Sequence, residues 1–130
     1  ELTVKTAFLT LLFNDIAYIM DSEPALARTY ADLTMIVRPE MRQYQLLDIL
    51  LEFKYVPLSE ANLTGEEARR LSEAQVRALP SVQAGLAEAR GRLQGYRQAL
   101  VARYGDRLRL RCYAVVSLGF DRLAWEEELL

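Results

Sequence analysis

The length, composition and charge of the chain are those of a single globular domain: it has 130 residues, of which 52% are hydrophobic and 26% charged. The formal net charge is −2 and there is no histidine, so the commonest general base and the usual zinc ligand are excluded. Any metal would therefore be a hard cation held by carboxylates.

Three features bear on where the chain works. Charged residues interrupt every apolar run before the roughly 20 residues that a membrane span needs, and the start of the chain lacks the pattern of a signal peptide. The single cysteine, Cys112, cannot form an internal disulfide, so we expect a reducing, cytoplasmic setting with no membrane partner. The chain begins with Glu1 rather than Met, from which we expect a piece of a longer protein.

In chain order, the first predicted element is a largely buried helix over residues 2–20, where Phe8, Leu12 and Ile16 recur at helical spacing. Residues 29–37 and 44–56 follow as two predicted strands. Their short connection indicates an antiparallel hairpin. The second strand is apolar on both faces, which is typical of a central strand that is covered on both sides.

Helices are predicted for the next part of the chain. Thr64 followed by Glu67 fits an N-cap with its capping-box partner, and Pro80 interrupts the helix that they open. A longer helix is predicted from about residue 81 to 104, with Gly105 as its stop.

The last part of the chain completes a mixed α/β domain. Residues 108–118 are predicted to form a third strand. Residues 120–130 fit either an edge strand or a terminal helix.

Three charged residues lie within the two predicted hairpin strands. Side chains alternate between the faces of a strand, so Glu52 and Lys54 project together while Phe53 points to the opposite core. Burying such charges is costly unless they are paired or coordinate a metal. Asp32 poses the same question on the preceding strand, and a hairpin would bring it near Glu52.

These residues would suffice for hydrolysis of a phosphodiester bond. Asp32 and Glu52 offer carboxylate oxygens to Mg²⁺ or Mn²⁺, which polarises a phosphoryl oxygen and lowers the pKa of bound water. Lys54 would position that water or stabilise charge developing on the phosphate. The alternative is a purely structural domain, with an ordinary ion pair between Glu52 and Lys54 and with Asp32 in a turn.

The stretches Arg-Thr-Tyr-Ala-Asp-Leu (28–33) and Leu-Glu-Phe-Lys-Tyr (51–55) resemble the second and third motifs of the PD-(D/E)XK nuclease superfamily. In particular, they resemble the nuclease-like domain at the C-terminus of bacterial AAA-ATPase-like proteins. The resemblance implies a restriction-endonuclease-like core over residues 1–130, a mixed central sheet with a β-hairpin carrying the site and helices on both sides. It also implies that Asp32, Glu52 and Lys54 are the catalytic residues.

The resemblance extends to auxiliary residues. Gln94 and Tyr96 fall in the helix where the family has a Gln and a Tyr, although their spacing is not the wider Gln-x-x-x-Tyr of some relatives. Glu1 is the natural candidate for the acidic residue that the family often adds on its first helix, and so for a further metal ligand. Asp48 alternates onto the same face as Glu52, although we expect it at a solvated strand end.

The function that the resemblance implies is Mg²⁺- or Mn²⁺-dependent cleavage of nucleic acid, DNA rather than RNA, by a domain attached to an AAA-ATPase-like domain. The alternative is a catalytically idle nuclease fold that acts as an interaction or regulatory module for that ATPase-like domain. The acidic composition favours the alternative, because phosphate contacts need local Lys and Arg.

Seven arginines give the predicted helical region 66–104 an excess of positive charge. Such a surface suits a nucleic-acid backbone, but we expect most of them to lie on a solvated helix face beside acidic neighbours. They are Arg69, Arg70, Arg77, Arg90, Arg92, Arg97 and Arg103.

Overall fold

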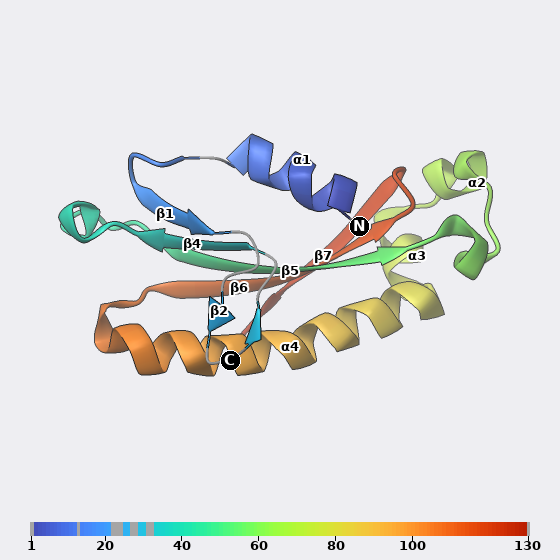
Figure 1. Ribbon diagram of the computed structural model, residues 1–130. Helices are drawn as coiled ribbons and strands as arrows, with labels where there is room; N and C mark the ends of the chain where they lie inside the picture. The colour runs from blue at the N-terminus through green and yellow to red at the C-terminus, as the bar shows by residue number, and fades with distance from the viewer. Residues whose placement is uncertain (1, 13, 22–24, 27–28, 31–32, 130) are drawn as a thin grey trace.

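The chain folds into an α/β domain around one five-stranded mixed sheet with the strand order β1-β4-β5-β6-β7 (Figure 1). The computed structural model describes residues 2–12, 14–21, 25–26, 29–30 and 33–129. The strands of this sheet are β1 (Tyr18–Asp21), β4 (Leu33–Val37), β5 (Asp48–Val56), β6 (Leu110–Leu118) and β7 (Arg122–Glu128). A separate two-stranded ribbon consists of β2 (Ala25–Leu26) and β3 (Thr29–Tyr30).

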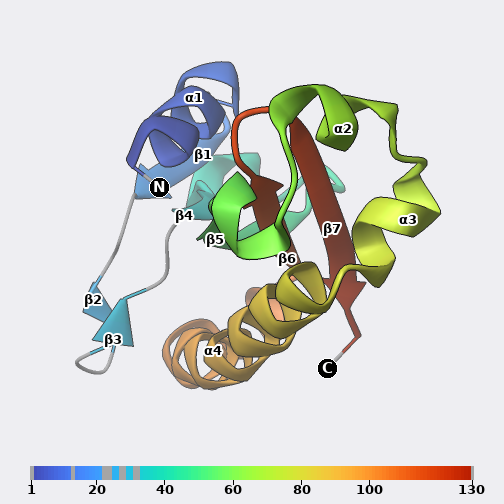
Figure 2. The ribbon, with the colours of Figure 1, turned by 90° about the vertical axis from the view of Figure 1, so that its right-hand side faces the viewer.

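Helices cover both faces of the sheet, with α1 on one side and α4 on the other (Figures 1 and 2). The α-helices are α1 (Leu2–Leu12), α2 (Gly65–Arg70), α3 (Glu73–Ala78) and α4 (Pro80–Tyr104). Three short 3-10 helices are η1 (Pro39–Met41), η2 (Leu58–Ala61) and η3 (Gly105–Arg107).

The direction of the strands changes in the middle of the sheet. Strands β1, β4 and β5 are antiparallel neighbours, β6 runs parallel to β5, and β7 is antiparallel to β6. The parallel pair needs a crossover, which the segment with α2, α3 and α4 supplies. Leu33 pairs with Leu51 across β4 and β5, which confirms the predicted antiparallel pairing for these strands. The first predicted strand began too early, because Thr29 and Tyr30 pair with β2 instead. The predicted central position of the second hairpin strand is also confirmed.

The predicted helix over residues 2–20 is wrong for residues 14–20, where the chain turns and returns as β1. The side chain of Asn14 holds the turn: its Oδ1 accepts hydrogen bonds from the main-chain N–H groups of Ile16 and Ala17, both at 3.2 Å. Ile16, which helical spacing placed on a buried face, is 76% exposed. The pairing of β1 with β4 then favours an extended chain over a longer helix.

The start of the helical region follows the predicted capping chemistry. Thr64 and Glu67 form the expected capping box, but the helix that they open, α2, ends at Arg70. A second capping box, between Ser72 and Gln75, begins α3, which the sequence analysis did not separate.

Three further predictions concern the ends of the long helix and the last part of the chain. Pro80 is at the first turn of α4, where a proline is compatible with a helix, so it starts this helix. Gly105 ends α4 with a φ of 62°, which confirms the predicted stop. Residues 122–128 form the edge strand β7, which decides between the two predicted possibilities.

The sheet separates two apolar cores. On the α4 side, Leu50 and Val56 of β5 pack with the buried face of α4, which includes Leu86 and Leu93. On the α1 side, Phe53 of β5 packs against Phe8, with ring centroids 4.7 Å apart. Strand β5 therefore has a buried side chain on each face, as its sequence predicts.

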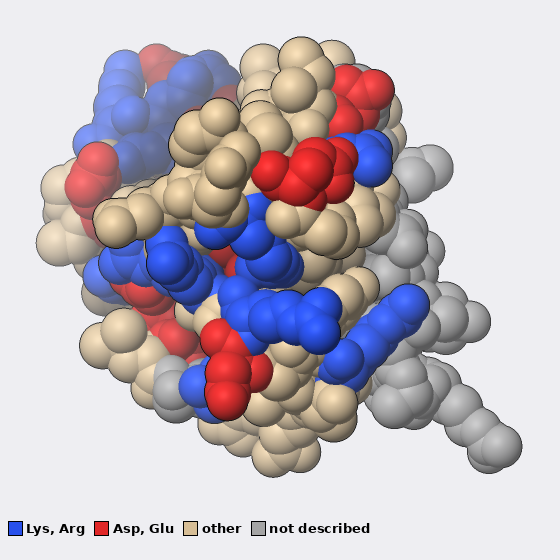
Figure 3. All heavy atoms as spheres, turned by 90° about the vertical axis from the view of Figure 1, so that its left-hand side faces the viewer, with Lys and Arg blue, Asp and Glu red and all other residues tan. Residues whose placement is uncertain are grey.

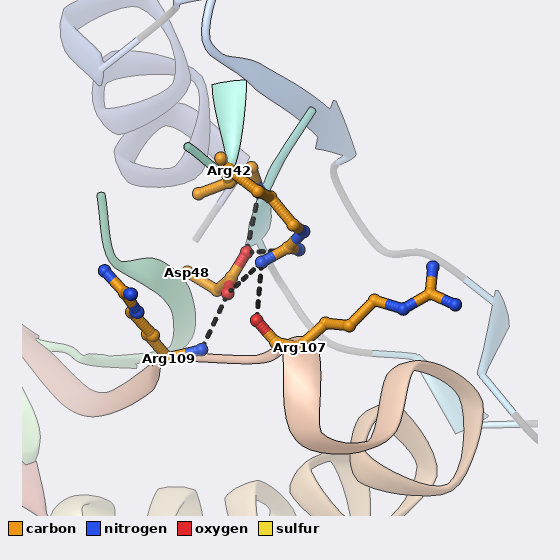
Figure 4. A network of polar contacts seen from close by, with 5 residues as sticks. Arg42, Asp48, Arg107 and Arg109 are labelled. Atoms are coloured by element: carbon orange, nitrogen blue, oxygen red, sulfur yellow. Dashed lines mark hydrogen bonds and ion pairs between the residues drawn. The ribbon is translucent and has the colours of Figure 1, made fainter. Parts of the chain in front are cut away.

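A buried carboxylate joins the ends of three strands (Figure 4). Asp48 is 0% exposed, which corrects the expectation of a solvated strand end. Its Oδ1 accepts from the main-chain N–H of Val37 at 2.7 Å and its Oδ2 from that of Arg109 at 2.9 Å. The guanidinium of Arg42 donates to both oxygens and to the main-chain carbonyl of Arg107. We call this group the Asp48 network.

Replacement of Asp48 by Asn tests the Asp48 network. Both carboxylate oxygens face donors, so an amide NH₂ would oppose an N–H group and leave Arg42 without its charged partner. We expect Asp48→Asn to lower the free energy of unfolding by about 3 kcal/mol in urea titrations. The same change at the exposed Asp106 should shift it by less than about 0.5 kcal/mol. Equal effects at both positions would contradict the role given to Asp48.

The reactivity of the Cys112 thiol tests whether the core on the α4 side is closed to solvent. Burial raises the pKa of its thiol to about 11, so the reactive thiolate is scarce near neutral pH. We expect a thiol-reactive chromophore to label Cys112 only when urea unfolds the chain. The folded-state pKa lies above that of the unfolded chain, so the free energy of unfolding should fall as the pH rises from about 9 toward 11. Rapid labelling of the native protein would show that this core is open.

Candidate functional site

Glu52 and Lys54 project from β5 toward α4, as their spacing predicts. The side chain of Glu52 is 1% exposed and that of Lys54 is 14% exposed. Phe53, between them, lies in the opposite core. Two charged groups therefore lie in the interface between the central strand and the long helix.

Two residues of α4 meet these charges. Arg92 Nη1 lies 3.3 Å from Glu52 Oε1, and Arg92 Nη2 lies 3.4 Å from Glu88 Oε1. Lys54 Nζ lies 2.8 Å from the same Glu88 oxygen. The four side chains form a chain of alternating sign, Glu52, Arg92, Glu88 and Lys54, which we call the charge cluster.

A close approach of α4 to the sheet positions the charge cluster. At Gly85 an added Cβ would lie 3.1 Å from Val116 Cγ2 and 3.7 Å from Lys54 Cβ, so the helix backbone lies close to β5 and β6 at this point. Glu88 follows Gly85 by three residues and Arg92 follows by seven, which keeps both on the same side of the helix. The glycine thus brings the helix near enough for Glu88 to reach Lys54.

Electrostatics keep the helix members of the charge cluster ionised. The hydrogen bond from Lys54 is the main cause that lowers the pKa of Glu88. Burial acts to lower the pKa of Arg92, but the attraction and hydrogen bond of Glu52, together with the charges of Tyr96 and Glu88, outweigh it and the pKa is raised. Glu88 is therefore negative and Arg92 positive at neutral pH.

The other predicted site residues have different positions. Asp32 and Glu1 lie outside the described residues. Gln94 is exposed on α4, and Tyr96 is buried among the apolar residues beneath this helix. The described structure therefore brings Glu52 and Lys54 together and keeps Gln94 on the surface.

Glu88 and Arg92 were not predicted as partners of Glu52 and Lys54. Most arginines of this region, and their acidic neighbours, were expected on a solvated helix face. A signal was present in the helical spacing, because Glu88, Arg92 and Tyr96 recur at intervals of four residues. Four residues are about one helical turn, so Arg92 shares a face with the buried Tyr96 and Gln94 does not.

The described residues do not by themselves complete a metal site. Among them, no group of three or more Asp, Glu or Cys side chains is arranged to hold a metal ion. Glu52 and Glu88 both contact the guanidinium of Arg92, so two carboxylates already converge on one cation of the protein itself.

Comparison with protein-family models, curated proteins and solved structures gives no match for this chain. None of the helices in the described part of the chain is long and apolar enough to cross a membrane.

The stability of variants at Glu52 separates a functional charge from a structural one. Arg92 is 51% exposed, so its guanidinium can return to water when Glu52 is removed. We expect Glu52→Met to keep or raise the free energy of unfolding, by up to about 2 kcal/mol. The reason is that the free energy needed to remove the carboxylate from water exceeds the free energy gained from its attraction to the partly exposed Arg92. Glu52→Ala, which also leaves a cavity, should be less stable than Glu52→Met. A loss of about 3 kcal/mol in Glu52→Met would assign Glu52 a structural role.

Proposed function

We propose that the chain is a metal-dependent, nuclease-like domain of the PD-(D/E)XK superfamily that hydrolyses phosphodiester bonds of nucleic acid, DNA in preference to RNA. One observation carries this proposal. Glu52 and Lys54 lie side by side on the central strand, where neighbouring positions are apolar and packing alone needs no charge. Charged side chains buried at such positions are costly unless they are paired or bind a ligand.

The fold supports the proposal. The mixed sheet, the β4–β5 hairpin and the helices on both faces agree with the restriction-endonuclease-like core that the resemblance implies. Glu52 and Lys54 lie on the second strand of this hairpin, where the resemblance assigns them. The AAA-ATPase-like domain in the same protein is a further part of the proposal and rests on the sequence motifs alone.

The residues divide the chemistry between them. A buried carboxylate fits the oxygen ligands that Mg²⁺ and Mn²⁺ prefer, so Glu52 would hold the ion together with Asp32, and Glu1 is a further candidate. The ion would polarise a phosphoryl oxygen and acidify a bound water. Lys54 would orient that water or stabilise charge on the phosphate. Arg92 is half exposed, so its guanidinium can turn from Glu52 to a substrate phosphate without becoming a buried, uncompensated charge.

A second candidate function is a catalytically idle module that regulates or binds the AAA-ATPase-like domain. The observation in its favour is the composition of the charge cluster, in which two carboxylates face two cations. Their formal charges sum to zero, so the cluster needs no bound ion to be neutral.

Cleavage assays decide between the two functions. We expect the protein to cut labelled single- or double-stranded DNA or RNA in the presence of Mn²⁺ or Mg²⁺ and not in EDTA. Glu52→Gln and Lys54→Met should each lower the rate by about 100-fold or more, because each removes a group that acts on the reacting phosphate. Glu73→Gln, an exposed carboxylate on α3, is the matched control and should cleave as the wild type does.

Calorimetric titration with Mn²⁺ gives the second measurement. Saturable binding that Glu52→Gln abolishes is expected of the metal site. A folded wild-type protein that neither cleaves nucleic acid nor binds Mn²⁺ through Glu52 would instead favour the idle module.

A further inference from the structure

One end of the molecule concentrates the positive charge of an otherwise acidic chain. Residues 97–111 contain five arginines and one aspartate, a net charge of +4, whereas the whole chain carries −2. The remaining residues therefore sum to −6. Residues 97–111 form the end of α4, η3 and the start of β6, and Figure 3 views the molecule from this end, where basic side chains gather over the surface.

Four of these arginines have no carboxylate partner within the described part of the chain; they are Arg97, Arg103, Arg107 and Arg109, which we call the arginine face. The fifth, Arg111, is held by both oxygens of Glu127 at 2.6 and 2.8 Å. Most other arginines whose side chains are described are paired in the same way, for example Arg69 with Asp121 and Arg70 with Glu66. The arginine face therefore presents cations that the fold itself does not neutralise.

The Asp48 network explains why two of these side chains point outward. It uses the main-chain N–H of Arg109 and the main-chain carbonyl of Arg107. Figure 4 shows both guanidinium groups directed away from Asp48. The backbone at this end is thus fixed while the charged side chains remain free to contact another molecule.

A groove runs along one side of the arginine face. It has a volume of about 670 Å³ and is lined by Arg97, Arg109 and Asp106, with Leu47 and Val101 among its apolar residues. Both of these apolar side chains are exposed. A groove lined by both arginines and apolar side chains suits a sugar–phosphate chain, because the arginines contact phosphates while sugars and bases cover the apolar surface.

The other side of the arginine face is aligned with the charge cluster. Arg103 follows Arg92 by eleven residues, which is close to three helical turns, so both side chains leave α4 in nearly the same direction, about 16 Å apart along its axis. A polymer that contacts Arg103 and continues along the helix therefore reaches Arg92, the exposed partner of Glu52.

We propose that the arginine face binds the phosphate backbone of nucleic acid and guides the strand along α4 to the charge cluster. The choice of nucleic acid over other polyanions rests on the proposed nuclease function. Binding of this kind is independent of sequence and weakens steeply with salt, because each phosphate contact releases counterions.

Fluorescence anisotropy with short labelled DNA, in EDTA and over a range of NaCl concentrations, tests the arginine face. We expect Arg97→Gln/Arg109→Gln and Arg103→Gln/Arg107→Gln each to raise the Kd by about tenfold and to reduce the salt slope by about 2. The matched control is Arg69→Gln/Arg70→Gln, which removes the same charge from α2 and should leave the Kd within about twofold of the wild type. The proposal would be overturned if the control and test variants lost equal affinity for DNA, or if the test variants lost none.

Two further arms separate this inference from the nuclease function. DNA binding that depends on the arginine face in EDTA, without cleavage by the wild type in Mn²⁺, would support the arginine face and refute only the enzyme. Tighter binding of polyglutamate than of DNA at equal charge concentration, with the same dependence on the four arginines, would instead indicate an acidic protein as the partner and overturn the choice of nucleic acid.

Discussion

The geometry of the sheet depends on the buried carboxylate of Asp48. It fixes the end of β4 through Val37, the start of β5 through its own backbone and the approach to β6 through Arg109. These contacts hold β5 and β6 in a register that pairs Glu52 with Ala114. A slip of one residue would turn Glu52 and Lys54 to the opposite face of the sheet. The position of the charge cluster is thus a consequence of hydrogen bonds made at the start of the same strand.

The two buried carboxylates of β5, Asp48 and Glu52, have different kinds of hydrogen-bond partner. The partners of Asp48 include two main-chain N–H groups, which cannot move away, and an arginine that is mostly buried. Glu52 instead contacts the side chain of Arg92, which is half exposed and can rearrange at little cost. Asp48 is therefore held by donors fixed in the main chain, whereas the contact of Glu52 with Arg92 depends on a side chain that can move.

The sequence predicted the features that depend on local chemistry. The capping box at Thr64, the stop at Gly105 and the alternation of Glu52, Phe53 and Lys54 follow from hydrogen bonding and strand periodicity, and each is confirmed. It did not predict the strand β1, because the apolar spacing around Ile16 fits a helix and the turn depends on the Asn14 side chain. Nor did it predict the pairing of Glu88 with Lys54, because that contact depends on how closely α4 approaches the sheet at Gly85. Tertiary distances of this kind are not encoded in any one segment.

The parallel pairing of β5 and β6 has a consequence for how the chain acquires its structure. Their partners are far apart in sequence, as Glu52 and Ala114 are separated by 62 positions. Contacts of such high sequence separation form late and slow folding. During synthesis, β5 would therefore emerge with one edge unpaired until β6 is made, and its apolar composition makes that edge a site for mispairing with other chains. The nascent chain should thus be most prone to aggregation, and most dependent on chaperones, during the time between synthesis of β5 and synthesis of β6.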